Sequence, residues 1–340
     1  IDLKIQNMKP GNWISTKLKE EITKRLGAGE QSLLFLNRRG YAPITLCKSC
    51  GFQIGCKHCD ARLVQHRYKN MLICHQCGDS ASVPTACPNC LIEGKLKAIG
   101  PGIERLEEEC SSLFPDSKIG VLSSDNVESI SELQKRIAKF TSGDVDIIIG
   151  TQLVSKGHNF PNITLVGVID ADLGLQGSDL RAAEKTFQSL RQVSGRAGRH
   201  KKVGKALLQT YSPEHPVILA IVRGDDDIFW AVEAAARKSA GSPPFGKMVA
   251  LILSGVDEKE LFGIAHYMAR LWEASYKSEA KIFGPALAPV SKIRGRYRVR
   301  LLIKAQKKKN IQTSIRSWLK RIAIPRSVKM NIDVDPQNFY

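Results

Sequence analysis

Hydrophobic and polar residues follow two different patterns along the first two thirds of the chain. Amphipathic stretches with apolar residues three and four positions apart, such as residues 15–26 and 130–140, indicate helices. Short apolar runs at residues 145–151 and 163–172 are typical of parallel strands that are buried on both faces. Further helices are expected at residues 102–114 and 181–195, and further strands at residues 31–40, 117–124 and 204–211. This alternation of strand and helix predicts a mostly parallel sheet with helices on both faces.

The pattern changes after Pro213 and Pro216. A helical linker and the breaker GSPPFG (residues 241–246) precede patterns in the order strand, helix, strand, strand, helix, strand. This order matches a ferredoxin-like α+β unit. Its six elements are expected at residues 247–255, 259–275, 281–285, 296–305, 311–322 and 328–336.

A cysteine-rich block interrupts the first pattern and is interpreted as an insertion. The expected domains are the first part of an α/β lobe (residues 1–44), the insertion (45–92), the second part of the lobe (93–215), and a linker helix with a basic α+β domain (216–340). The predicted fold class is therefore α/β, with an inserted module and a ferredoxin-like C-terminal domain.

The charge of the chain points to a polyanionic partner. The 340 residues include 51 Lys and Arg against 33 Asp and Glu, which gives a net charge of +18. Nucleic acid is the leading candidate and an anionic membrane surface the second. The sequence contains no apolar run of 18 residues and no signal-peptide pattern, which weakens the membrane interpretation. Residues 291–330 hold fourteen Lys or Arg and no Asp or Glu, so the C-terminal domain carries most of the excess charge.

Eight of the nine cysteines form four CxxC pairs, which are typical of zinc ligands. Fourteen residues separate Cys59 from Cys74, enough for two short strands and a turn, and this spacing favours a nested arrangement. One zinc site would then contain Cys56, Cys59, Cys74 and Cys77, and the other Cys47, Cys50, Cys87 and Cys90. Sequential and interleaved pairings remain open. Four-thiolate sites are structural rather than catalytic, and reduced thiols indicate a cytoplasmic protein. The ninth cysteine, Cys110, is expected to be a small buried hydrophobe.

The chain shows no phosphate-binding loop of its own. The nearest match to GxxxxGK[ST] is GSPPFGKM, in which Met248 replaces the magnesium-binding hydroxyl. Pro243 and Pro244 also remove two N–H groups from that loop. The sequence therefore predicts that any nucleotide is held mainly by another polypeptide region.

The stretch QVSGRAGR (residues 192–199) places Arg196 and Arg199 among glycine and alanine. Small residues at these positions suggest close backbone approach, with two guanidinium groups directed at one polyanion. Such a pair suits an arginine finger that stabilises charge on phosphates held elsewhere. The alternative is that both arginines form salt bridges within the domain. Asp170 and Asp172, at the end of an apolar run, are interpreted as capping the following turn or holding the next helix.

These segments resemble a known family. QVSGRAGR resembles motif VI of superfamily 2 helicases, and GTQLVSKGHNFPNITLVGVIDAD (150–172) resembles their motif V. Together with the CxxC pairs, LLFLNRRGYAP, GPGIERLEEE, GSPPF, GPALAP and DVDP, the whole chain resembles the C-terminal half of the PriA family of replication-restart helicases. The resemblance implies that the α/β lobe is a RecA-like second motor lobe, and it implies the same nested zinc pairing.

The resemblance also assigns roles to single residues. Gln192, Arg196 and Arg199 would face ATP, and Gly157 would line the cleft. Thr151, Gln152 and Lys156 would contact DNA or couple it to ATP. The C-terminal domain would bind branched DNA and single-strand-binding protein through Arg296, Arg298, Lys304, Lys307 and Lys308. The cofactors would be two Zn²⁺, with ATP and Mg²⁺ held mainly by a first lobe that this chain lacks.

The expected function is therefore recognition of stalled or branched forks, ATP-dependent 3′–5′ unwinding, and loading of the replicative helicase. Further partners would be single-stranded DNA, primosome proteins and the helicase loader. Because the chain begins at Ile1 and lacks a phosphate-binding loop, we expect it to be part of a longer protein and inactive alone. The alternative function is a stand-alone, zinc-containing scaffold that binds DNA forks without catalysis.

Overall fold

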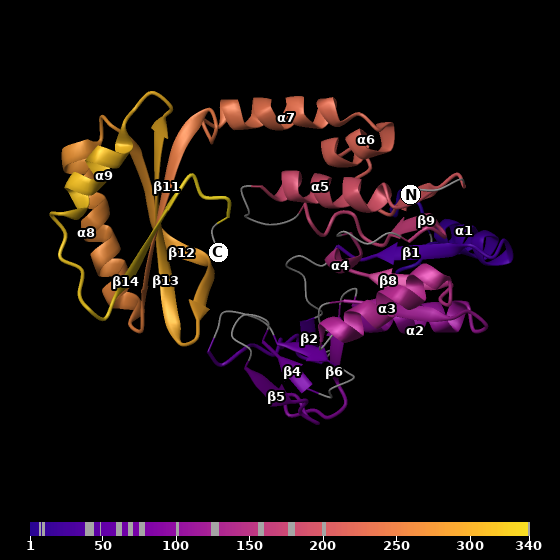
Figure 1. The fold of residues 1–340 in the computed structure, drawn as a ribbon. Coiled ribbons are helices and arrows are strands. Elements are labelled where there is room, and N and C mark those ends of the chain that lie inside the picture. The colour runs from indigo at the N-terminus through magenta and orange to yellow at the C-terminus, as the bar shows by residue number, and fades with distance from the viewer. Residues whose placement is uncertain are drawn as a thin grey trace. The chain divides into compact units, whose positions relative to one another are not determined.

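A computed structural model of the chain contains two compact units (Figure 1). The first comprises residues 1–43, 100–177 and 182–229, and the second residues 44–99, 178–181 and 230–340. The structure describes residues 1–6, 8, 11–37, 44–47, 49–58, 63–66, 71–74, 79–99, 102–123, 129–155, 160–175, 181–198 and 202–338. None of the helices in these ranges combines the length and apolarity that a membrane crossing needs.

The first unit is built on a parallel five-stranded sheet with the order β10-β9-β1-β8-β7. Its strands are β1 (Gln31–Phe35), β7 (Ile119–Leu122), β8 (Ile147–Gly150), β9 (Ile163–Val168) and β10 (Lys205–Leu208). Its helices are α1 (Thr16–Gly27), α2 (Ile103–Leu113), α3 (Ile130–Ser142), α4 (Gln152–Ser155), α5 (Ala182–Ser194) and α6 (Pro216–Arg223). The alternating elements predicted from the sequence are confirmed.

Successive residues of each strand point to opposite faces of the sheet, and both faces are covered. Leu34 packs with Leu18 and Ile22 of α1 and with Leu106 and Cys110 of α2. Leu33 and Phe35 belong instead to a core that includes apolar residues of α3, α5 and α6. This two-sided burial explains why the central strands are apolar at successive positions rather than only at alternate ones. Cys110 is fully buried, as expected for a core residue outside the CxxC pairs.

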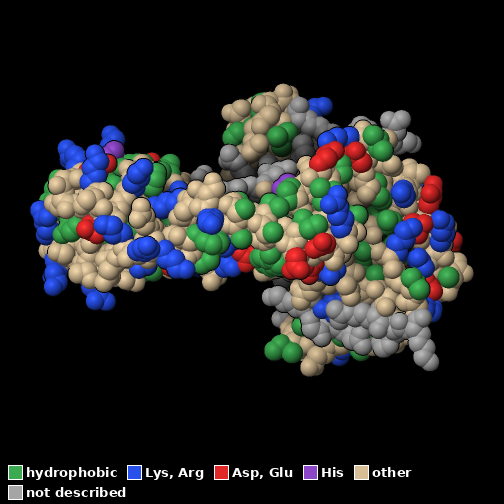
Figure 2. Space-filling view, turned by 90° about the horizontal axis from the view of Figure 1, so that it is seen from above, with side chains coloured by type: hydrophobic (Ala, Val, Ile, Leu, Met, Phe, Trp, Pro, Cys, Tyr) green, Lys and Arg blue, Asp and Glu red, His purple; other side chains and the backbone are tan. Residues whose placement is uncertain are grey.

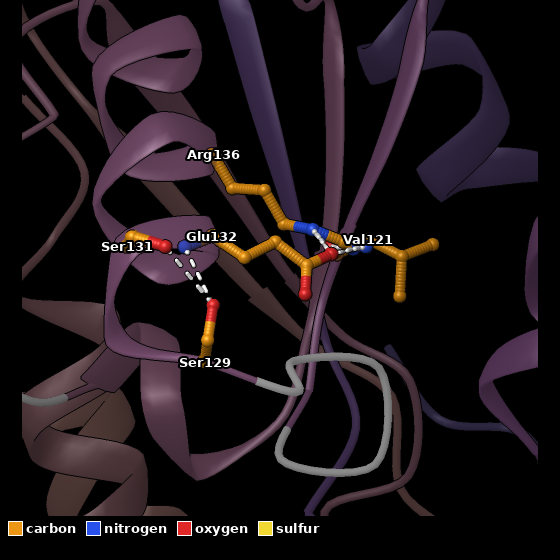
Figure 3. A network of polar contacts seen from close by, with 5 residues as sticks. All are labelled: Val121, Ser129, Ser131, Glu132 and Arg136. Carbon is orange, nitrogen blue, oxygen red and sulfur yellow. Dashed lines mark hydrogen bonds and ion pairs between the residues drawn. The ribbon is translucent and has the colours of Figure 1, made fainter.

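The helix α3 is fixed at both its start and its sheet-facing side (Figure 3). The Ser129 hydroxyl accepts a hydrogen bond from the Glu132 backbone N–H, which caps the helix. Arg136 donates to Glu132 one turn earlier, and its Nη1 donates to the Val121 carbonyl oxygen of β7 at 3.0 Å. The side of the helix that faces the sheet is therefore set by one charged pair as well as by apolar packing.

The second unit contains the cysteine-rich block. β2 (Ile44–Cys47) and β6 (Leu96–Ile99) pair antiparallel and close the block at its base. Between them, β3 (Val64–His66), β4 (Met71–Ile73) and β5 (Ser80–Ser82) form a three-stranded sheet. β3 and β4 are the two short strands expected between the second and third CxxC pairs.

The C-terminal domain has a four-stranded antiparallel sheet with the order β12-β13-β11-β14. Its elements are β11 (Gly246–Gly255), α8 (Glu258–Tyr276), β12 (Lys281–Ile293), β13 (Arg296–Gln306), α9 (Ile311–Leu319) and β14 (Lys329–Val334). The order of elements and strands is that of the predicted ferredoxin-like unit. Both helices pack on one face around the buried pair Trp272 and Trp318, whose rings meet edge to face.

Two features differ from the sequence prediction or add to it. β12 continues to Ile293 rather than ending at residue 285, because its irregular pairing with β13 resumes beyond two shifts of register. Arg294 and Gly295 then form a two-residue hairpin turn in which both φ angles are positive. The Gly295 N–H donates to the carbonyl oxygen of His58, and Ile293 packs against the apolar cluster of the cysteine block. Within the second unit, this hairpin therefore contacts the block directly.

The helix α7 (Asp226–Ser239) follows α6. Its first turn belongs to the first unit, where Phe229 stacks on Phe187 of α5 with ring centroids 4.1 Å apart. Asp226 lies 2.8 Å from Nε of Arg191 on the same helix α5. The expected helical linker is therefore present, and its start is attached to the helix that precedes the arginine motif.

Candidate functional site

Four cysteine sulfurs come together at the base of the cysteine-rich block. The Sγ atoms of Cys47, Cys50, Cys87 and Cys90 all lie within 4.8 Å of one another. Cys47 lies 3.7 Å from Cys90, and Cys50 lies 3.7 Å from Cys87. These are the first and fourth CxxC pairs, so the chain between them returns to the same point.

The two CxxC turns use the same backbone geometry. The Gly51 N–H donates to the Cys47 carbonyl oxygen, and the Leu91 N–H donates to the Cys87 carbonyl oxygen, each at 2.9 Å. Gly51 and Leu91 both have positive φ angles, of 74° and 60°. Glycine adopts this conformation readily, whereas leucine does so at some cost. The shared turn brings both sulfurs of each pair to one side.

The cluster fits a tetrahedral zinc ion. Four thiolates about 2.3 Å from a zinc ion form a tetrahedron with edges of about 3.8 Å, close to the two 3.7 Å separations observed. The donor set is all sulfur, which zinc accepts. The N–H of Phe52, assisted by the Asn89 amide, lowers the pKa of Cys50 to about 6. At Cys90 the N–H of Ile92 also lowers the pKa, but burial and the three neighbouring sulfurs outweigh it and raise that pKa to about 12. A closed four-sulfur site leaves no position for a substrate.

The second expected site is described only in part, because Cys59 and Cys77 lie outside the described residues. Cys74 is buried in the apolar cluster of the block, and Cys56 packs against that cluster. The His58 N–H donates to Cys56 Sγ at 3.4 Å, as expected within a CxxC turn. Asp79 lies 3.9 Å from Cys56 Sγ and 4.0 Å from Nε2 of His58. The described half of this site therefore consists of two thiols with a carboxylate beside one of them.

The arginine motif lies at the end of α5, where the chain turns toward β10. Gln192 is exposed on the helix, whereas Arg196 is only 4% exposed. Arg199 lies outside the described residues. The Gly198 N–H donates to the carbonyl oxygen of Ile163, the first residue of β9. This contact places the motif at the amino ends of the strands. Arg196 was expected to face a nucleotide together with Arg199, and in this structure its side chain is buried.

Two of the four residues expected to couple ATP to DNA, Thr151 and Gln152, lie at the other end of the parallel strands. Thr151 follows the last residue of β8, and Gln152 begins α4. β8 and β9 both run parallel to β1, so Thr151 lies at the carboxyl ends of the strands, opposite the arginine motif. Thr151 is largely buried, and its N–H donates to the Leu122 carbonyl oxygen. Lys156 and Gly157 lie outside the described residues.

Two aspartates stabilise the loops at the carboxyl ends of the parallel strands. Asp170 Oδ1 accepts hydrogen bonds from the N–H groups of Asp172 and Leu173, and burial raises the pKa of Asp170. Asp172 accepts from the Thr210 hydroxyl and the Tyr211 N–H, both at 2.6 Å. The interpretation of Asp170 as a turn cap is confirmed. Asp172 holds the segment after β10, which the sequence did not indicate.

The charged side chains in view on the C-terminal domain, at the left of Figure 2, are mostly Lys and Arg. Three of the five basic residues expected to bind DNA or a partner already form intramolecular hydrogen bonds. Arg296 donates to Ser254 and to the Ser327 carbonyl oxygen, Arg298 donates to the Val290 carbonyl oxygen, and Lys304 donates to that of Ala240. Lys307 and Lys308 are both exposed, whereas Arg296, Arg298 and Lys304 are partly buried.

The near match to a phosphate-binding loop is not one. Gly246 begins a strand, β11, where a phosphate-binding loop requires the start of a helix. A Cβ on Gly246 would lie 2.1 Å from the carbonyl oxygen of Gly241, so the segment folds tightly on itself. This stretch therefore has the conformation of a tight turn before a strand rather than that of a loop before a helix.

Sequence reasoning did not identify Glu30, whose carboxylate contacts one strand, one helix and the residue Lys202 beyond the arginine motif. Its carboxylate accepts hydrogen bonds from the Thr164 hydroxyl of β9 and from Arg25 of α1, and it pairs with Lys202 beyond the motif. No short sequence pattern marks a single glutamate before a strand as a functional residue. The one weak signal in this region was Gly204, because a glycine immediately before a strand can indicate close approach of another backbone segment.

Family models match three parts of the chain. Residues 93–201 match the helicase conserved C-terminal domain, residues 56–81 the PriA DNA helicase Cys-rich region domain, and residues 238–337 the primosomal protein N C-terminal domain. These segments correspond to the second part of the α/β lobe, the cysteine-rich block and the ferredoxin-like domain.

Curated relatives match the chain over its whole length. The replication restart protein PriA of Rickettsia conorii is 45% identical over 340 residues, covering 100% of this chain and 52% of that protein. The replication restart protein PriA of Bacillus subtilis is 36% identical over 336 residues, covering 97% and 42%. The chain spans about half the length of the curated relatives it matches. Among solved structures, the C-terminal domain of the DEAD-box protein Dbp5 is 14% identical, covering 65% of this chain and 90% of that one, with a TM-score of 0.32.

Proposed function

The chain belongs to the PriA family of replication restart proteins, whose C-terminal half it matches, and we propose that it forms the second motor lobe, zinc module and C-terminal domain of a replication-restart helicase. The observation that supports this most strongly is that the two groups of motif residues lie at opposite ends of the parallel strands. The arginine motif follows α5 at the amino ends of the strands, and Thr151 and Gln152 lie at their carboxyl ends. One end of the sheet would face ATP and the other DNA, with α5 running between them.

In this proposal Arg199, with Gln192, acts on ATP that another lobe holds together with Mg²⁺. A guanidinium group placed near the γ-phosphate stabilises negative charge as the phosphoryl group is transferred. DNA binding would be coupled to ATP hydrolysis through Thr151, Gln152, Lys156 and Gly157. Arg196 would contribute from inside the lobe, because its side chain is buried.

The zinc module would hold two Zn²⁺, one in the cluster of Cys47, Cys50, Cys87 and Cys90 and one in the partly described second site. The C-terminal domain would bind forked or single-stranded DNA and single-strand-binding protein. Lys307 and Lys308 are the best placed, because Arg296, Arg298 and Lys304 already donate within the domain. Primosome proteins and the replicative helicase or its loader are the further proposed partners, and the cytoplasm is the proposed location.

The polarity of unwinding tests this proposal in a full-length protein that contains these residues. We expect ATP-dependent displacement of a strand when the single-stranded tail allows 3′–5′ movement, and greater displacement on a forked duplex than on a blunt one. A gel-based strand-displacement assay with matched 3′-tailed, 5′-tailed, forked and blunt duplexes measures this. Displacement restricted to the 5′-tailed duplex, or independent of ATP, would contradict the proposal.

The 340-residue chain alone is expected to bind DNA in a salt-dependent way without hydrolysing ATP. The reason is that the chain contains arginines but no GxxxxGK[ST] loop to hold the phosphates. Phosphate release, measured with and without single-stranded DNA, should equal that of a buffer control. Turnover stimulated by DNA would show that the chain carries its own nucleotide site.

A further inference from the structure

Residues 1–3 lie along the edge of the parallel sheet, beside β10. The Thr210 N–H donates to the Ile1 carbonyl oxygen at 3.1 Å, and the Leu3 N–H donates to the Thr210 carbonyl oxygen at 2.9 Å. Asp2 and Thr210 therefore form a parallel β-bridge. On its other side β10 pairs with β9. Residues 1–3 are thus an additional parallel segment on the outer side of β10.

The residue that pairs with this segment is also held by a buried carboxylate. The Thr210 hydroxyl donates to Oδ1 of Asp172, and the Tyr211 N–H donates to Oδ2, both at 2.6 Å. Asp172 is 6% exposed and Thr210 is 2% exposed. Asp172 is the last residue of the stretch 150–172, which resembles motif V. One carboxylate, through both of its oxygens, therefore connects the end of this stretch to the residue that pairs with residues 1–3.

A second attachment holds the chain just before α1. Gln209 is fully buried; its Oε1 accepts from the Ser15 N–H at 2.9 Å, and its Nε2 donates to the Trp13 carbonyl oxygen at 2.7 Å. Glu109 of α2 accepts from the Trp13 N–H at 2.8 Å. This part of the chain and residues 1–3 are therefore both attached to the lobe through the segment that directly follows β10 or through α2.

We propose that Asp172 is a positioning residue of the motor: by holding Thr210, it fixes residues 1–3 against the end of the stretch that resembles motif V. This inference rests on the proposed function, in which another lobe, preceding this one in the polypeptide, holds ATP. The polypeptide would then enter this lobe as an edge segment of its sheet rather than as a flexible linker. Asp172 is buried and acts through Thr210, without touching ATP or DNA itself.

The location of this attachment indicates which step it would affect. Asp172 and Thr210 lie at the carboxyl ends of the strands, the end at which Thr151 and Gln152 are proposed to face DNA. Conformational steps such as the closure of two lobes depend on residues that can lie far from the reacting atoms. Loss of the attachment should therefore reduce the effect of DNA on ATP turnover more than it reduces turnover without DNA.

Replacing either partner of the Asp172–Thr210 hydrogen bond tests this in a full-length protein that contains these residues. Asp172→Ala should lower the DNA-stimulated kcat for ATP by roughly tenfold, with little change in turnover without DNA or in affinity for a forked DNA. Thr210→Val, the milder change, should lower it in the same way, because it removes the hydroxyl and keeps the branched shape. Thr210→Ser should retain most of the stimulation, and combining Asp172→Ala with Thr210→Val should give no further loss.

Asp146→Ala is the matched control. Asp146 Oδ2 accepts from the Lys118 N–H at 2.7 Å, so this carboxylate also joins two distant segments of the lobe, but at the amino ends of β7 and β8. Its replacement should leave the stimulation by DNA unchanged. An equal loss of stimulation in Asp146→Ala and Asp172→Ala would overturn the inference. A parallel loss of DNA affinity and of turnover without DNA in Asp172→Ala would show that Asp172 only stabilises the fold, which would also overturn it.

Hydrogen exchange tests the attachment itself, independently of activity. In Asp172→Ala the amides of Leu3 and Thr210 should lose protection, whereas those of β1 and β8 should keep it. Unchanged protection of Leu3 and Thr210 would overturn the inference even if turnover fell. If the parent protein showed no ATP turnover that DNA stimulates, the proposed function itself would fail, and the exchange result would still decide whether Asp172 holds residues 1–3.

Discussion

Replacing Arg199 with alanine is expected to lower DNA-stimulated ATP turnover by about a thousandfold in a full-length protein that contains these residues. The expected cause is the loss of a guanidinium group that stabilises charge on the γ-phosphate as it is transferred. Because this interaction forms mainly in the transition state, kcat should fall while the KM for ATP changes little. Steady-state phosphate release over a range of ATP concentrations measures both constants.

Binding to DNA provides the contrast that separates this role from a structural one. The proposed DNA-facing residues Thr151 and Gln152 lie at the carboxyl ends of the parallel strands, away from the arginine motif. Affinity for a forked DNA should therefore stay nearly unchanged in Arg199→Ala. A parallel loss of DNA binding and turnover would indicate that Arg199 instead forms salt bridges within the lobe. Fluorescence anisotropy with a labelled fork measures the affinity at a fixed salt concentration.

Arg191→Ala is a suitable control for the removal of an arginine. Arg191 lies on α5 before the motif, and it pairs with Asp226 at 2.8 Å on the exposed surface. Its removal should leave turnover close to that of the parent protein. Arg196 cannot serve this purpose, because it is 4% exposed and loss of a buried guanidinium group destabilises the fold itself.

The sequence was sufficient to predict most of the architecture, because the signals involved are local. Continuous apolar runs marked the strands that are buried on both faces, and amphipathic spacing marked α1, α3 and α5. The order β10-β9-β1-β8-β7 was not predictable from these patterns, since it depends on how distant segments pack. The full length of β12 was also missed, because Pro285 and Pro289 interrupt its strand pattern and its pairing with β13 is irregular.

The candidate site shows the same division between local and distant information. Spacing of the CxxC pairs favoured the nested arrangement in which the sulfurs of the first and fourth pairs meet, although sequential and interleaved pairings stayed open. Glycine and alanine around Arg196 correctly indicated close backbone approach, which Gly198 and Gly204 provide. The burial of Arg196 and the contacts of Glu30 with Thr164 and Lys202 involve residues far apart in the chain, and no short pattern encodes them.

Zinc content provides the second large expected effect. Cys87→Ser should remove one of the two expected zinc ions, because a four-sulfur site loses a ligand that a hydroxyl replaces poorly. Zinc binding to structural sites is strongly coupled to folding, with apparent free energies of about 10–16 kcal/mol in small zinc-binding peptides. The amides of β2 and β6, at the base of the block, should therefore lose protection from hydrogen exchange. The parallel sheet belongs to the other unit and should keep its protection.

Cys110→Ser is the matched control for the loss of a buried cysteine. Cys110 is fully buried in α2, outside the four CxxC pairs. Its replacement should lower stability by placing a hydroxyl in an apolar core, yet it should leave zinc content unchanged. Elemental analysis of the purified variants gives the number of zinc ions per chain. Zinc loss in Cys110→Ser would show that the metal responds to general destabilisation rather than to removal of a ligand.

The double variant Cys47→Ser, Cys87→Ser then decides between the pairings that the sequence leaves open. In the structure these two cysteines belong to one cluster, so the double variant should retain one zinc ion, as each single variant does. Sequential or interleaved pairing would place Cys47 and Cys87 in different sites, and the double variant would then lose both ions. Retention of one zinc ion would also show that the site of Cys56, Cys59, Cys74 and Cys77 binds metal independently. The block would then be two nested zinc sites, of which the inner one folds without the outer.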